Sequence, residues 1–213
     1  MLSLVQYAPY VGAVGLALAL ILYWRITRQP SGQDRTRMIG RLIEEGAMTF
    51  LRRQYIVLAP VLVIVAWALS ATVGWKIGAA YVFGGISSIV AGYLGMRAAT
   101  KTNLRTAEAA RTSGRAQALM LAFGGGAVMG LAVASLGLVG LGLLANLLID
   151  VTLGAGVSHE TMVLFAEVTS GFAMGASSIA LFARVGGGIY TKAADVGADL
   201  VGKGEAGIPE DDP

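Results

Sequence analysis

The sequence predicts an all-α fold, a polytopic transmembrane helical bundle with five spanning helices. Only 14% of its 213 residues are charged and 55% are hydrophobic, too little charge to cover the surface of a soluble domain of this length. Five segments are also long and apolar enough to cross about 30 Å of hydrocarbon at about 1.5 Å per residue. They are Tyr7 to Tyr23, Ile56 to Val73, Ile77 to Met96, Ala118 to Leu148 and Met162 to Phe182.

The first span is interpreted as a retained anchor, because no positive residue precedes it and its apolar run is long for a cleavable signal. A short linker follows, Pro30 to Asp34. From Arg35 to Arg53 apolar residues recur at helical spacing, which predicts an amphipathic helix along the membrane surface. Its arginines could steer an anionic substrate, but topology and lipid contact are the favoured explanation.

Thr102 to Arg115 is expected to extend the third span beyond the membrane. The fourth span is longer than a bilayer requires, so it should tilt or protrude. Two pairs of glycines, Gly126 with Gly130 and Gly171 with Gly175, have the spacing that allows helices to pack closely in lipid.

Lysine and arginine alternate between loops. Seven arginines follow span one and five basic residues follow span three, whereas Lys76 alone lies between spans two and three and none lies between spans four and five. By the positive-inside rule the N-terminus is outside and the C-terminal tail is cytoplasmic. The chain is therefore expected to be a multi-pass membrane protein.

The tail concentrates acidic residues, with six of the thirteen carboxylates in the last nineteen positions. Lys192, Asp195, Asp199 and Lys203 are three, four and four residues apart, so on a helix they share one face. Carboxylate oxygens beside lysines suit Mg²⁺ bound to phosphate. The same spacing also fits an ordinary solvated helix with ion pairs, and the spacing leaves both interpretations open.

The string GGGIYTKAADVGADLVGK, followed by E-x-G-I-P-E-D-D-P, resembles the signature of the membrane-bound, ion-translocating inorganic pyrophosphatases, which pump H⁺ or Na⁺. The resemblance extends through Gly171 to Arg184 and more loosely through Ile43 to Tyr55 and Ala122 to Leu131. One departure is Gly204, where the family usually has valine or isoleucine. A glycine lowers helix stability by about 1 kcal/mol, so the last turn is expected to fray around Glu205.

The resemblance implies roles for single residues. Lys192 would bind pyrophosphate, Asp195 and Asp199 would bind Mg²⁺, and Arg184 would belong to the ion pathway beneath the hydrolytic site. Catalytic aspartates that activate water are expected beyond residue 213. An outer acidic loop without separate roles would comprise Lys203, Glu205, Glu210, Asp211 and Asp212.

The resemblance also implies that the fold has about sixteen spans. Residues 1–184 would be the first five, with their amphipathic cytoplasmic loops, and 185–213 the start of the cytoplasmic segment that binds pyrophosphate and Mg²⁺. This chain would then be an N-terminal portion, inactive alone, of a pump that is homodimeric at full length. The implied cofactor is Mg²⁺, with K⁺ as a further candidate. The expected location is a bacterial plasma membrane, and no nucleic-acid partner is expected.

The alternative is a non-enzymatic five-span subunit or small carrier whose acidic tail binds cations. Glu167, the other ionisable residue in an apolar span, has two open interpretations. It is either a buried, hydrogen-bonded group or a residue near the outer interface.

Overall fold

The computed structural model describes residues 6–150 and 159–209. Within these residues five long helices follow one another, and a short π-helix, η1, continues the last of them. Each of the five is long and apolar enough to cross a membrane. The described residues contain no strand, so the all-α prediction is confirmed. The helices are α2 (Ala8–Thr27), α3 (Asp34–Thr72), α4 (Trp75–Thr112), α5 (Arg115–Asp150) and α6 (His159–Ala198), with η1 at Asp199–Glu205.

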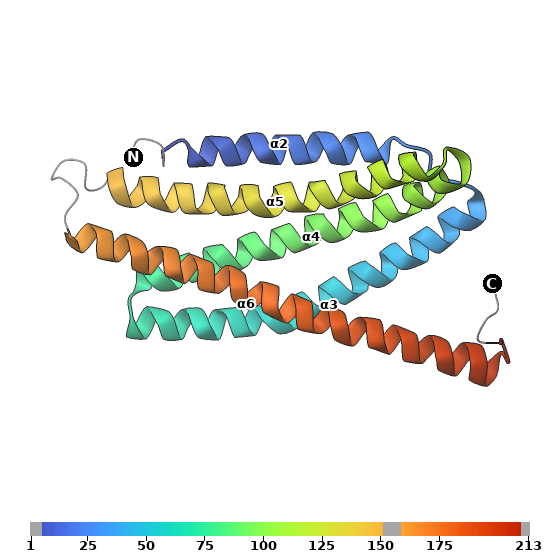
Figure 1. The fold of residues 1–213 in the computed structure, drawn as a ribbon. Coiled ribbons are helices and arrows are strands. Elements are labelled where there is room, and N and C mark those ends of the chain that lie inside the picture. The colour runs from blue at the N-terminus through green and yellow to red at the C-terminus, as the bar shows by residue number, and fades with distance from the viewer. Residues whose placement is uncertain (1–5, 151–158, 210–213) are drawn as a thin grey trace.

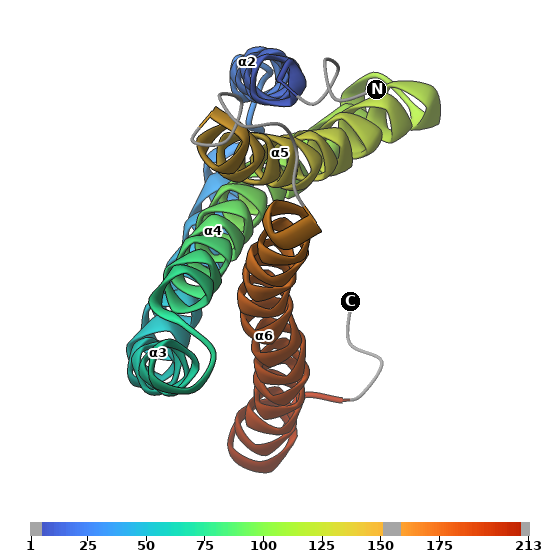
Figure 2. The same ribbon diagram turned by 90° about the vertical axis from the view of Figure 1, so that its left-hand side faces the viewer.

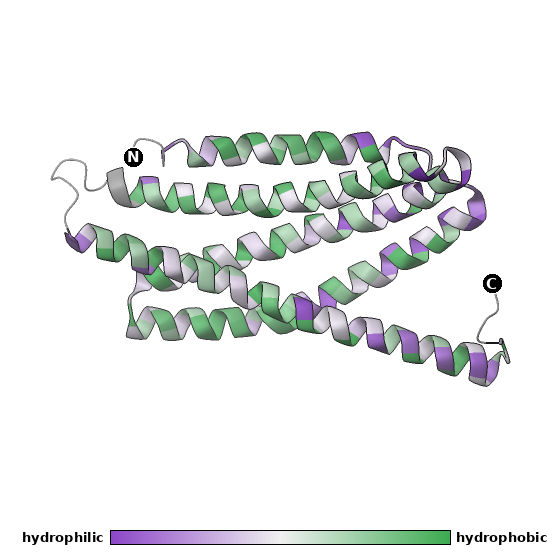
Figure 3. Ribbon diagram, in the orientation of Figure 1, coloured by the Kyte–Doolittle hydropathy of each residue, from purple (hydrophilic) through white to green (hydrophobic). Residues whose placement is uncertain are grey.

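The helices run up and down, so their charged ends gather at one end of the bundle (Figure 1). Figure 3 shows hydrophilic residues concentrated at this end, on the start of α3 and the end of α6. Two connections are very short and use glycine in a positive-φ conformation, Gly74 between α3 and α4 (φ 149°) and Gly114 between α4 and α5 (φ 87°). The alternation of basic loops predicted from the sequence therefore matches the connectivity of the helices.

The boundary predicted between a surface helix and the second span is wrong. Arg35 to Thr72 belongs to a single helix, α3, of 39 residues with Pro60 inside it. No helix-breaking residue lies between Arg53 and Ile56, so nothing separates the polar segment from the apolar one. Figure 1 shows the first half of α3 slanting relative to the second half rather than forming a separate element. The expected extension of the third span is confirmed, because α4 continues to Thr112.

Helix α4 lies at the centre and contacts each of the other four. Figure 2 shows α5 between α2 on one side and the pair α4 and α6 on the other. Large apolar side chains on the outer faces stay exposed, such as Met120 at 75% and Phe123 at 70%. Such an exposed surface is suited to lipid tails rather than to water. Three apolar clusters hold the bundle, centred on Tyr81 with Leu58, on Phe172 with Ile77, and on Ala98 with Ile26.

Close packing at glycine is confirmed for one predicted pair and wrong for the other. A Cβ atom on Gly171 would lie 2.8 Å from the carbonyl oxygen of Ile77 on α4, and one on Gly175 would overlap the carbonyl oxygen of Tyr81. By contrast, Gly126 and Gly130 have nothing within 4 Å of the same position. Both lie on the exposed face of α5, because small-residue spacing does not reveal which side of a helix its neighbours occupy.

Candidate functional site

The candidate site lies along the end of α6 and in η1. Helix α6 is uninterrupted from His159 to Ala198, so Arg184 and Asp195 are on one helix. Eleven residues correspond to about 16 Å along the axis and about 20° of rotation. Arg184 is thus about three turns nearer the apolar part of α6, on almost the same side as Asp195. The geometry that the prediction required is present, and the role of Arg184 stays a prediction.

The four regularly spaced charged residues form two ion pairs, and we call them the Lys/Asp ladder (Lys192, Asp195, Asp199 and Lys203). The Nζ of Lys192 is 3.6 Å from Oδ2 of Asp195, and the Nζ of Lys203 is 3.2 Å from Oδ1 of Asp199. The aspartate side chains are 68% and 65% exposed. Exposed pairs of this kind contribute only about 0–1 kcal/mol to stability. The ladder therefore adds little to the fold and leaves its carboxylates accessible.

The ladder can supply part of a magnesium site but not a closed one. Asp195 and Asp199 are one helical turn apart and offer hard carboxylate oxygens toward solvent. Within residues 6–150 and 159–209, no three His, Asp or Glu side chains gather closely enough to hold a metal ion by themselves. Mg²⁺ commonly uses one or two protein carboxylates and takes its other ligands from water and substrate phosphates. The donor set fits that mode of binding.

In the second half of the ladder the helix widens into η1, which starts at Asp199, instead of fraying at Gly204 as expected. The N–H of Ala206 donates to the carbonyl of Val201 at 2.9 Å, a bond that spans five residues. Gly207, with φ 62°, then turns the chain out of the helix. Glu205 is consequently held in the last π-helical turn, with an exposed side chain. The other members of the predicted acidic loop, Glu210, Asp211 and Asp212, lie outside the described residues.

The end of α6 is held in place by the polar half of α3. Gln54 donates from Nε2 to the carbonyl oxygen of Phe182 at 2.9 Å. This hydrogen bond attaches α6 to α3 two residues before Arg184. Two residues before Lys192, the ring of Tyr190 lies 4.9 Å from that of Phe50, centroid to centroid. Gln54 and Phe50 are four residues apart and so lie about one turn apart on the same side of α3. The continuation of α3 out of the apolar region therefore supports the segment that carries the ladder.

The structure places the two ionisable residues of the apolar span on exposed surface of this chain. Arg184 and Glu167 are both exposed, and neither has an ion-pair partner within the part of the chain that the structure describes. Nothing among the described residues buries the side chain of Glu167 or bonds to its carboxylate. For Arg184 the same exposure leaves the guanidinium donors free for other partners.

Sequence reasoning missed one charged cluster at the same end of the bundle. The carboxylate of Glu44 on α3 accepts a hydrogen bond from Nζ of Lys101 on α4 and lies 4.0 Å from Nη2 of Arg97. Its side chain is only 22% exposed. The sequence could have indicated this position. Glu44 precedes the apolar residues Ala47 and Leu51 by three and seven positions, so on a helix it lies on the same face as these two buried residues.

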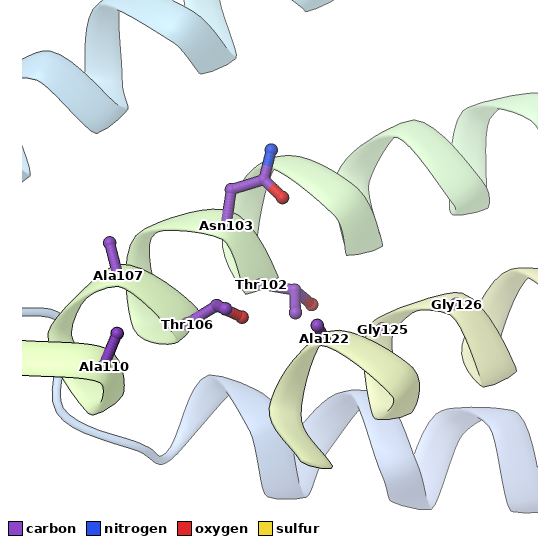
Figure 4. A pocket seen from close by; sticks show the side chains of 8 residues that line it. All are labelled: Thr102, Asn103, Thr106, Ala107, Ala110, Ala122, Gly125 and Gly126. Atoms are coloured by element: carbon purple, nitrogen blue, oxygen red, sulfur yellow. The ribbon is translucent and has the colours of Figure 1, made fainter. Parts of the chain in front are cut away.

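A pocket between α4 and α5 with three polar lining residues was also missed (Figure 4). Its volume is about 400 Å³, and Thr102, Thr106 and Asn103 are its polar lining residues. The Oγ1 atoms of both threonines are buried and have no hydrogen-bond partner in the described structure. Alanines and glycines form the rest of the lining. The sequence indicates only a helical extension here, since a threonine in a polar segment carries no sign of its burial.

Comparison with known proteins relates the whole chain to one family. The family model described as inorganic H⁺ pyrophosphatase matches residues 13–213. A protein of Clostridium tetani, provisionally named a K(+)-stimulated pyrophosphate-energized sodium pump, is 50% identical over 214 residues, which cover 99% of this chain and 29% of that protein.

Two further relatives have pump names of both kinds. A K(+)-insensitive pyrophosphate-energized proton pump of Methanosarcina mazei is 45% identical, over 99% of this chain and 29% of its own length. A K(+)-stimulated pyrophosphate-energized sodium pump of Thermotoga maritima is 42% identical, over 94% of this chain and 29% of its own length. The chain thus spans about 29% of the length of these relatives. With five apolar spanning helices and a family match across residues 13–213, it is an integral membrane protein that belongs to the inorganic H⁺ pyrophosphatase family.

Proposed function

We propose that this chain works within a pyrophosphate-energised ion pump, in which hydrolysis of pyrophosphate to two phosphates drives H⁺ or Na⁺ across the membrane. The observation that carries the proposal is the family match over residues 13–213, with relatives named as pumps of both ions. The arrangement of α6 supports it, because one helix joins an apolar span to an exposed face of lysines and aspartates.

Lys192 is proposed to bind the pyrophosphate. Its side chain is 83% exposed, and its ammonium group pairs with Asp195 at 3.6 Å. Asp195 and Asp199 are proposed to hold Mg²⁺, whose other ligands would be water and phosphate oxygens. Bound there, Mg²⁺ would offset negative charge on the phosphoryl group being transferred.

Arg184 is proposed to contribute to the ion pathway. It lies about 16 Å from Asp195 along a single helix whose backbone hydrogen bonds are continuous. A shift of the ladder end of α6 would therefore move Arg184 as part of the same rigid element. Lys203, Glu205, Glu210, Asp211 and Asp212 are proposed as the outer rim of the substrate site.

Further proposals concern the cellular context. The concentration of arginine at one end of the bundle supports a cytoplasmic ladder and an outside N-terminus. A bacterial plasma membrane is proposed from the resemblance to the family. The names of the relatives differ in K⁺ response, so K⁺ is proposed as a second cation to be tested in the same assay as Mg²⁺. A homodimeric assembly at full natural length is proposed from the resemblance to the family.

The test is Mg²⁺-dependent phosphate release by the full-length protein in native membranes. Lys192→Met and Asp195→Asn are expected to lower turnover at least about a hundredfold, as when a charge-stabilising group is removed from an active site. The matched control is Asp34→Asn. Asp34 is likewise an exposed aspartate three residues from its cationic partner, at 3.6 Å from Arg37. Its substitution should leave turnover unchanged.

Unchanged phosphate release in both ladder variants, with correct folding, would contradict the roles proposed for the ladder. Absence of Mg²⁺-dependent release by the wild-type protein would favour a non-enzymatic membrane subunit with a cation-binding tail. Residues 1–213 expressed alone are expected to release no phosphate, since the described residues contain no set of side chains that encloses a metal. Measurable release by this piece would show that the ladder is sufficient, and would overturn that part of the proposal.

A further inference from the structure

An apolar groove lies between α2 and α4, with α5 as its floor. We call it the α2/α4 groove; its volume is about 380 Å³. Its floor includes Val128 and Ala132 of α5, which are 4% and 1% exposed. Leu20 of α2 and Val90 of α4 stand on opposite walls and remain exposed at 61% and 39%. The groove is therefore open along its length to whatever surrounds the helices.

The groove is closed at the charged end of the bundle. There Ile26 of α2, Ala98 of α4 and Val128 pack together in one apolar cluster. Just beyond, Arg105 of α4 donates from Nη2 to the carbonyl oxygen of Thr27 at 2.7 Å and so ties the end of α2 to α4. From this junction the two helices diverge toward the other end (Figure 1). The groove is the space that widens between α2 and α4 as they diverge.

The closed end of the groove is polar and positively charged. Tyr23, Tyr93 and Arg97 line it. Arg97 donates from Nη1 to the Tyr93 hydroxyl at 3.0 Å, and its side chain remains 44% exposed. Its distant partner Glu44 is already bonded to Lys101. One carboxylate therefore faces two cations, which leaves a net positive charge at this end of the groove.

We propose that the α2/α4 groove binds an anionic phospholipid, with one acyl chain in the groove and the headgroup phosphate on Arg97. The groove follows α4 from Val90 to Arg97, which is about 10 Å and so two-thirds of the hydrocarbon depth of one leaflet. Tyrosines at such a depth suit the membrane interface. The groove is apolar along its length, has two tyrosines near its charged end and has Arg97 at that end. These three features together match the acyl chain, interface and headgroup of one lipid.

The shape of the walls favours a lipid chain over another helix. Helices pack against one another in membranes through small residues that let backbones approach. The pocket at Thr102 has that character, with alanines and glycines around two hydroxyls that lack partners (Figure 4). The α2/α4 groove instead has leucine, valine and tyrosine walls that protrude. A flexible acyl chain can follow such walls, whereas a helix would be held away from the floor.

The experiment measures lipid bound to the full-length protein. The protein is stripped of lipid in mild detergent and equilibrated with mixed micelles containing equal phosphatidylglycerol and phosphatidylcholine, and adducts are counted by native mass spectrometry. Wild type is expected to keep one lipid per chain, with phosphatidylglycerol preferred about fivefold, the effect of about 1 kcal/mol per basic residue at an anionic surface. Arg97→Gln should abolish the preference, so that phosphatidylglycerol and phosphatidylcholine bind about equally.

A second variant tests the apolar part independently. Val90→Trp fills the groove and should lower lipid occupancy of either headgroup at least fivefold. The matched controls are Arg115→Gln at the start of α5 and Val133→Trp, whose side chain is 50% exposed and does not line the groove. Both should behave as wild type. The proposal is overturned if the wild-type protein retains no lipid, as when other protein segments cover the groove. It is equally overturned if Val90→Trp and Val133→Trp retain the same amount.

Discussion

Replacing Gly175 with alanine should push α4 and α6 apart. Gly175 is buried where α6 crosses α4. An added Cβ would overlap the carbonyl oxygen of Tyr81, lie 2.7 Å from its carbonyl carbon and lie 3.0 Å from the amide nitrogen of Gly85. All three are backbone atoms, so no side chain can rotate away to make room. The methyl group can be accommodated only by moving one helix relative to the other.

The magnitude follows from two opposed effects. Adding a methyl group to a packed core costs about 1–3 kcal/mol, and the upper end applies because the obstacles are backbone atoms. Alanine in place of glycine favours the helix by about 1 kcal/mol. The net expectation for Gly175→Ala is a loss of about 2 kcal/mol. Gly130→Ala is the matched control, because nothing lies within 4 Å of its added Cβ, and it should gain up to about 1 kcal/mol.

The assay is reversible unfolding in mixed detergent micelles, followed by circular dichroism, for wild type and both variants at the same protein concentration. The two variants should differ by about 3 kcal/mol, with wild type between them. Equal stabilities would refute the argument, since the helix propensities of the two substitutions are the same and only the contact with α4 distinguishes them.

Two further predictions concern carboxylates at the charged end. Glu44→Gln should lower the free energy of unfolding by about 1–2 kcal/mol, because it weakens a charge-assisted hydrogen bond with Lys101; Glu45→Gln, at an exposed position, should stay within about 0.5 kcal/mol of wild type in the same assay. Hydrogen bonds from Arg111 hold the pKa of Glu108 below its usual 4.5. This contribution is present above that pH and is lost as pH falls through the lowered pKa. Glu108→Gln should therefore weaken the acid dependence of unfolding, and an unchanged dependence would contradict the assignment.

Hydropathy and charge were sufficient to predict the number of spanning helices and their alternating direction. These features depend on the length of apolar runs and on loop charge, which are local properties of the sequence. The Lys/Asp ladder was also predictable, because residues three and four apart on a helix are neighbours whatever surrounds the helix. Lys192 and Asp195 accordingly meet in an ion pair. Their proposed roles toward phosphate and metal came instead from family resemblance.

The features that sequence reasoning missed depend on contacts between distant segments. Gly175 meets Tyr81 while Gly130 meets nothing, although each belongs to a similar small-residue pair. Thr102 lost its partners through burial against α5, which polarity along α4 does not predict. The polar start of α3 was separated from its span because amphipathic periodicity was weighted above the absence of any breaker near Gln54. In each case the outcome depends on which face of the helix is covered by a neighbouring helix, and the local sequence does not contain that information.

The widened turns of η1 also affect the direction in which the chain leaves the helix. A π-helix uses about one residue more per turn than an α-helix, so over the seven residues Asp199–Glu205 it lags an α-helix by about a third of a turn. Glu205 therefore points to a different quadrant from the one that a uniform helical wheel would assign. If this stretch reverted to α-helical winding, Lys203 and the segment that follows would swing around the axis, while the pair of Lys192 and Asp195 on α6 would keep its geometry.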